Sequence, residues 1–106
     1  MKINILGTDY KIIKHENREE NEAFNNCDGW CDTSVKEIHV LVNLEGDKAN
    51  KQYVVDKIVR HEILHAFMYE SGQDVESVWG LNETLIDFLA IQIPKFNKAF
   101  KEANVI

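Results

Sequence analysis

The sequence has few of the residues that staple small secreted domains or break helices. Its 106 residues include only two cysteines and one proline. Cys27 and Cys31 are separated by three residues, which matches neither a disulfide framework nor the C-x-x-C pattern of zinc knuckles and redox sites. We expect Cys31 to pack as a small apolar residue and Cys27 to lie in a loop, with a second metal site as the alternative.

Basic residues and long apolar runs are also scarce. There are 12 Lys and Arg against 18 Asp and Glu, giving a formal net charge of −6 without any Lys/Arg cluster. This balance argues against binding to nucleic acid. No apolar stretch is long enough to span a membrane, and residues 1–4 lead into a strand-like pattern rather than a signal peptide. We therefore expect one soluble, cytoplasmic domain over residues 1–106, which contacts no membrane.

Residues 61–65 read His-Glu-Ile-Leu-His, the H-E-x-x-H pattern typical of zinc proteases. Residues four apart on a helix share one face, about 6 Å apart along the axis, so His61 and His65 can bind one ion. Glu62 lies on an adjacent face, where it can act as a general base toward a water molecule. The flanking apolar residues recur at helical spacing, which indicates a half-buried helix: Val54, Val55, Ile58, Val59, Ile63, Ala66 and Phe67.

A catalytic zinc site needs a third protein ligand. Metzincins would carry glycine and histidine where this chain has Met68 and Ser71, so that group is excluded. Glu83 opens the next apolar segment and lies one helical turn before Asp87, so both acids can face the first helix. Glu83 is the favoured ligand, although an acid at this place also suits a helix N-terminus. The other candidate ligands are Asp87, His15 and His39.

The two motifs together resemble those of the gluzincins, the thermolysin-like metallopeptidases. In that family H-E-x-x-H is followed by N-E-x-x-x-D, which here is the run from Asn82 to Asp87. The resemblance implies that Glu83 is the third zinc ligand and that Asp87 orients His61. Residues 28–96 are also similar to the ImmA/IrrE-like group of phages and mobile elements. That likeness implies a bacterial or phage-infected host cell and suggests a repressor-type regulator as the substrate.

The hydrophobic pattern predicts an α+β fold with a small, mostly antiparallel sheet and two helices packed on one face. Strands are expected at 3–6, 10–13, 29–32 and 37–43, with a loop or short helix over 16–26. A long helix carrying H-E-x-x-H is expected over about 48–70, capped by Asp47 and ended by Ser71-Gly72. A second helix, carrying Glu83, is expected over about 81–93, where Pro94 breaks it or begins a further helical turn through Phe96 and Phe100.

These features predict a zinc-dependent peptide-bond hydrolase. One Zn²⁺ would be held by His61, His65 and Glu83, and Glu62 would activate the water. The sequence does not identify the donor that would stabilise the oxyanion. The candidates by residue type are Tyr69, Tyr53 and His39.

The substrate would be a protein or peptide of narrow range. The strand at 37–43 either offers its edge to an extended peptide or is an interior strand, and Trp79 is a candidate pocket residue. The alternatives are a zinc-binding regulatory protein without efficient turnover, or an interaction module in which the motif is incidental.

Overall fold

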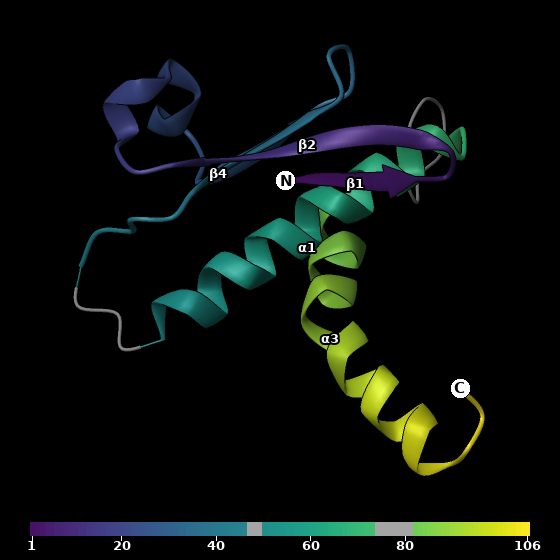
Figure 1. The fold of residues 1–106 in the computed structure, drawn as a ribbon. Helices are drawn as coiled ribbons and strands as arrows, with labels where there is room; N and C mark the ends of the chain where they lie inside the picture. Colours follow the sequence, from purple (N-terminus) through teal and green to yellow (C-terminus); the bar gives the residue numbers. More distant parts are fainter. Residues whose placement is uncertain (47–49, 74–81) are drawn as a thin grey trace.

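The computed structural model describes residues 1–46, 50–73 and 82–106 (Figure 1). The described elements, in chain order, are β1 (Lys2–Ile5), β2 (Thr8–His15), η1 (Arg18–Glu20), η2 (Glu22–Asn25), β3 (Gly29–Asp32), β4 (Glu37–Leu41), α1 (Lys51–Glu70) and α3 (Glu83–Glu102). The predicted α+β class is confirmed. The predicted cap Asp47, the helix starts at 48 and 81, and Trp79 lie outside the described residues. Among the described helices, none combines the length and apolarity that crossing a bilayer requires.

The four described strands form one mixed sheet in the order β1-β2-β4-β3. The pairs β1–β2 and β3–β4 are antiparallel, as expected, whereas β2 and β4 run parallel. A parallel neighbour needs a crossover, and the chain supplies it through η1, η2 and β3. The strand predicted over 37–43 is therefore an interior strand. The hypothesis that this strand offers its edge is wrong, because both of its edges are already paired, and β3 lies at the edge instead.

Helix α1 packs across one face of the sheet and closes the core (Figure 1). Alternate residues of β4 point toward it, as the period of two along a strand requires. Ile38 joins a buried cluster with Ala66 of α1, and Val40 joins a second cluster with Val55. His39, between these two, points to the opposite face of the sheet.

The C-terminal end of α1 is fixed to the sheet by one carboxylate. Glu70 accepts hydrogen bonds from the hydroxyl groups of Tyr10 at 2.6 Å and Thr8 at 3.1 Å, and from Nζ of Lys36 at 2.9 Å. Tyr10 is fully buried. These contacts join β2, the segment before β4 and the helix end, so they set the position of α1 along the sheet.

Helix α3 packs against α1 rather than on the sheet, and its second half extends away from the domain (Figure 1). Of the two alternatives predicted at Pro94, the break is wrong and the further helical turn through Phe96 and Phe100 is confirmed, because α3 continues through Pro94 to Glu102. Proline lacks the N–H that would bond to the carbonyl of Ala90. Nε of Arg60 in α1 donates to that carbonyl at 2.7 Å instead. The helix therefore continues because its neighbour satisfies the acceptor that proline leaves.

Candidate metal centre

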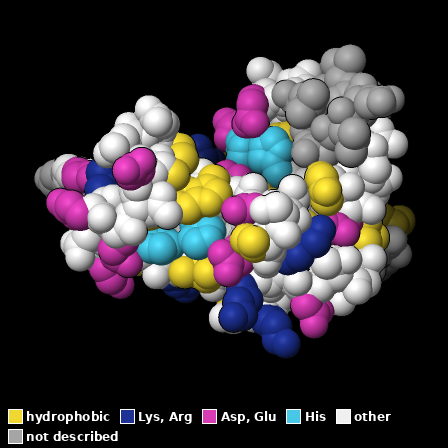
Figure 2. All heavy atoms as spheres, turned by 90° about the horizontal axis from the view of Figure 1, so that it is seen from above, with side chains coloured by type: hydrophobic (Ala, Val, Ile, Leu, Met, Phe, Trp, Pro, Cys, Tyr) yellow, Lys and Arg dark blue, Asp and Glu magenta, His cyan; other side chains and the backbone are white. Residues whose placement is uncertain are grey.

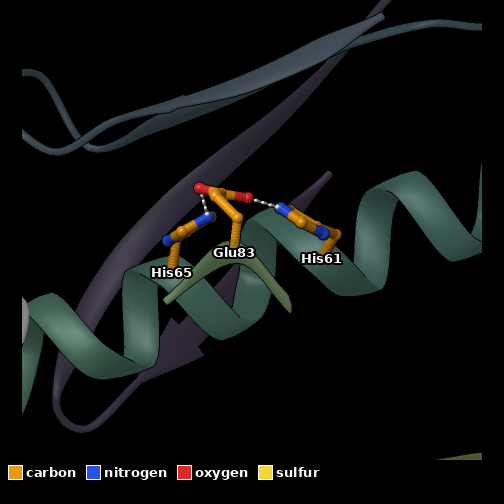
Figure 3. Close-up of side chains that lie close together, drawn as sticks. All are labelled: His61, His65 and Glu83. Atoms are coloured by element: carbon orange, nitrogen blue, oxygen red, sulfur yellow. Dashed lines mark hydrogen bonds and ion pairs between the residues drawn. The ribbon is translucent and has the colours of Figure 1, made fainter. Parts of the chain in front are cut away.

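Two helices bring the predicted ligands together. His61 and His65 lie one turn apart on α1, and Glu83 is the first residue of α3. The side chain of Asn82 caps α3 by accepting a hydrogen bond from the N–H of Leu85 at 2.9 Å. The cap fixes where α3 begins, and Glu83 therefore projects over the two histidines (Figure 3).

The three side chains meet through their ligand atoms. Oε2 of Glu83 lies 2.8 Å from Nε2 of His61, and Oε1 lies 2.9 Å from Nε2 of His65 (Figure 3). One ligand atom from each residue lies within 4.8 Å of the other two, and among the described residues this is the one such group. Two imidazoles and a carboxylate are a donor set typical of catalytic zinc.

A zinc ion fits this group with a small adjustment. Ligand bonds of about 2 Å at tetrahedral angles place ligand atoms about 3.3 Å apart. The histidine side chains are only 17% exposed, whereas that of Glu83 is 68% exposed. The histidines are held by the helix, so the carboxylate is the group free to move as the atoms close around an ion.

Asp87 lies next to His61, where the resemblance places it. Its Oδ1 is 3.5 Å from Nδ1 of His61, the ring nitrogen that does not face Glu83. A carboxylate at this position favours the tautomer with the proton on Nδ1, which leaves Nε2 available as a ligand. The candidate role of Asp87 as a ligand is disfavoured by this placement, because its contact is with the far side of the ring.

Glu62 is the buried acid of the centre. It is 8% exposed and is the one buried charged residue in the described part of the chain. Burial raises the pKa of its carboxyl above the ordinary value, and the charges of His61 and His65 act in the opposite direction. A carboxylate whose proton affinity is raised is suited to accept a proton from water.

Gly29 allows β3 to approach α1 closely at this point. A Cβ atom there would lie 2.7 Å from Cγ2 of Ile58 and 3.0 Å from the backbone oxygen of His39. Any side chain would therefore push the strand away from the helix. This contact was not predicted from the sequence, although a glycine at the start of a strand can indicate close backbone approach.

The candidate ligands open onto a cleft of about 690 Å³ between β3, α1 and the start of α3. Its described lining is Cys27, Asp28, Gly29, Trp30, Cys31, Thr33, Val54, Lys57, Ile58, His61, Glu62, His65, Glu83 and Asp87. Lys57 was missed by the sequence analysis. It lies four residues before His61, on the same helix face, and this spacing is the signal that could have identified it.

The other two histidines do not join this centre. Nε2 of His15 is 2.8 Å from Nδ1 of His39, and their outer nitrogens face Glu20 and Glu37. His39 also stacks on Trp30 at 4.4 Å between ring centroids. Figure 2 shows the two histidine groups as separate patches on one face of the molecule. The expectation that either histidine could be a third ligand to the pair on α1 is therefore wrong.

The tyrosines proposed as oxyanion donors also lie elsewhere. Nζ of Lys36 lies over the ring of Tyr69, 4.9 Å from the ring centroid. Tyr53, near the start of α1, is 52% exposed. Neither residue lines the cleft. Cys31 packs against the core, as expected, and the two cysteines, which are not joined in a disulfide, both line the cleft.

No protein-family model, curated protein or solved structure matches this chain.

Proposed function

We propose that this protein is a zinc-dependent peptide-bond hydrolase whose ion is held by His61, His65 and Glu83. The observation that carries the proposal is the convergence of their three ligand atoms within 4.8 Å, on a cleft that also contains the buried Glu62. Helical spacing alone explains why two histidines share a face. It does not explain why a carboxylate from a second helix lies between them.

The residues of the chain divide the chemistry among them. When bound, zinc supplies Lewis-acid chemistry, since it lowers the pKa of a water and polarises a carbonyl. Glu62 lines the cleft, takes the proton of the attacking water and passes it to the leaving amine. Asp87 holds the proton of His61 on Nδ1, which keeps Nε2 directed at the centre.

The edge of β3 provides a place for an extended peptide substrate. β3 pairs with β4 on one side, and in the described part of the chain no strand pairs with its other side. Residues 29–31 line the cleft beside the histidines. A peptide added there as a further strand would gain main-chain hydrogen bonds and pass the candidate metal centre.

The narrow substrate range and the cytoplasmic location belong to the same proposal. The domain is small and the cleft is bounded by one short strand and two helices, which leaves few side chains to recognise a substrate. A repressor-type regulator in a bacterial or phage-infected cell is supported by the sequence resemblance alone.

The decisive experiment compares the wild type with Glu62→Gln. We expect both proteins to bind one zinc per chain, measured by metal analysis after dialysis, because Glu62 is not a ligand. Only the wild type should cleave a mixture of unstructured peptides, detected by mass spectrometry. The variant should lose at least about 10²-fold in rate, since a positioned general base contributes that much or more.

Three results would separate the possibilities. Equal cleavage by Glu62→Gln would remove Glu62 as the base. Zinc binding without cleavage by the wild type would favour the regulatory alternative, in which the ion joins α1 to α3. If the wild type does not bind zinc and His61→Ala behaves in the same way, the H-E-x-x-H motif is incidental.

A further inference from the structure

Lys57 is the one lysine or arginine among the described residues that line the cleft. It precedes His61 by one turn and His65 by two turns of α1, so its side chain leaves the helix on the same face. The mechanism proposed above assigns no role to Lys57. Its position therefore bears on which substrate the cleft binds, rather than on how the attacking water is activated.

The contacts of Lys57 place it beyond His61, away from the candidate ion. Its Nζ lies 3.9 Å from Oδ1 of Asp87, at the outer limit of an ion pair. The same oxygen lies 3.5 Å from Nδ1 of His61, on the side of the ring opposite Nε2. The ammonium group is thus separated from the ligand atoms by the imidazole, and in this position it does not serve the scissile carbonyl.

Two other acids that line the cleft, Asp28 and Glu83, have partners of their own. Asp28 pairs with Nη2 of Arg18 at 2.7 Å, and both oxygens of Glu83 contact histidine nitrogens. Among the described residues, the ion pair found for Lys57 is the long contact with Asp87. Its side chain is 30% exposed, so an anion arriving through the cleft can reach it.

Two aliphatic side chains that neighbour Lys57 on α1 line the same cleft. They are Val54, three residues before Lys57, and Ile58, one residue after it. A group that binds here therefore meets a positive charge together with apolar surface. A carboxylate on a short methylene stem has this combination of features, whereas an amide or a cation does not.

We infer that Lys57 selects substrates that carry a carboxylate one or two residues from the cleaved bond. The inference rests on the proposed hydrolase function and names its substrate class. One turn of α1 spans about 6 Å between Lys57 and His61. An extended peptide advances about 3.3 Å per residue, so the carboxylate follows or precedes the bond by no more than two residues. It can be a Glu or Asp side chain or the terminal carboxylate of the chain.

The test uses three hydroxamate probes, because a hydroxamate binds zinc and no cleavage is needed. The first carries Leu-Glu-amide, the second Leu-Gln-amide, and the third Leu-Gln with a free terminal carboxylate. Binding to the zinc-loaded protein is measured by calorimetry. We expect the wild type to bind the first or the third probe about tenfold more tightly than the second, the scale of a charge-assisted hydrogen bond. The comparison of the first and third probes identifies the source of the carboxylate.

Three variants assign the preference to Lys57. Lys57→Gln should reduce the affinity ratio to about one without changing zinc content or the affinity for the Leu-Gln-amide probe. Lys57→Arg should keep the preference. Lys51→Gln removes the same charge from the same helix outside the cleft lining and should behave as the wild type.

The outcomes distinguish this inference from the function on which it rests. A wild type that binds zinc and all three probes equally, or a preference that survives in Lys57→Gln, would overturn the role of Lys57 alone. A protein that binds neither zinc nor any hydroxamate would overturn both.

Discussion

At the scale of single residues, the centre depends on where two ring nitrogens point. An imidazole has two nitrogens, and only the unprotonated one can bind an ion. For His61 the choice is set from α3, because Asp87 faces Nδ1 while Glu83 faces Nε2. One turn of a second helix therefore supplies both a candidate ligand and the group that favours one tautomer of His61.

Removing the tautomer partner should weaken zinc binding without abolishing it. We expect Asp87→Ala to lower the zinc affinity about 10- to 100-fold, the usual effect of deleting a hydrogen-bond partner of a ligating histidine. The affinity is measured by competition with a chromophoric chelator. Thr84→Ala, at an exposed position on the same turn of α3, is the control and should leave the affinity unchanged. An equal affinity in Asp87→Ala would show that Nδ1 of His61 does not need this partner.

At the scale of elements, a hydrogen bond from α1 to α3 replaces one that α3 cannot form within itself. Pro94 deprives α3 of a donor, and Arg60 from α1 supplies it to the fully buried Ala90. The same helix–helix contact carries Glu83 to the histidines. The geometry of the candidate centre is thus linked to the packing around Pro94.

This link predicts that substitutions at Arg60 and Pro94 have non-additive effects on the free energy of unfolding. Arg60→Met should lower the free energy of unfolding by about 1–3 kcal/mol, because it leaves a buried carbonyl without a donor. In a Pro94→Ala background the same change should cost about 1 kcal/mol less, since the alanine N–H can bond to the carbonyl of Ala90. Urea unfolding of the four proteins measures the coupling. Strictly additive values would mean that Arg60 does not replace the missing donor.

At the scale of the whole molecule, the sheet and α1 are held in register by an ionised carboxylate. The pKa of Glu70 is lowered below its ordinary value of 4.5, first by the hydrogen bond from Tyr10 and then by that from Lys36. A group whose pKa is depressed by folding stabilises the fold above its unfolded pKa. That contribution is lost as the pH falls through the folded pKa.

Stability should therefore fall on acidification partly through Glu70. Glu70→Gln should be less stable than the wild type at pH 7, and the difference should shrink as the pH falls below about 4.5. Thermal unfolding at a series of pH values measures it. Glu102→Gln, an exposed position outside this network, gives the background effect of removing one negative charge. A difference that is constant with pH would show that the ionised form of Glu70 is not what stabilises the fold.

The local features of this fold could be predicted from the sequence. The spacing of His61 and His65, the long helix around them, the strands and the α+β class were predicted, because they depend on the periodicity of neighbouring residues. Whether α3 continues through Pro94 was left open, because the carbonyl of Ala90 that proline leaves without a donor is satisfied by Arg60, thirty positions before Ala90. Whether β4 lies inside the sheet was also left open, because strand order depends on how distant segments pair.

Sequence by itself thus determined which side chains could hold an ion, and the resemblance indicated their roles. Only the tertiary structure decided that Glu83 lies between the two histidines, that His15 and His39 pair with each other, and that Lys57 enters the cleft. The reason is physical. Helical periodicity is fixed by bonds over one turn of chain, whereas the distance between residues on different helices or strands is set by packing, caps and close contacts such as that of Gly29 in β3 with α1.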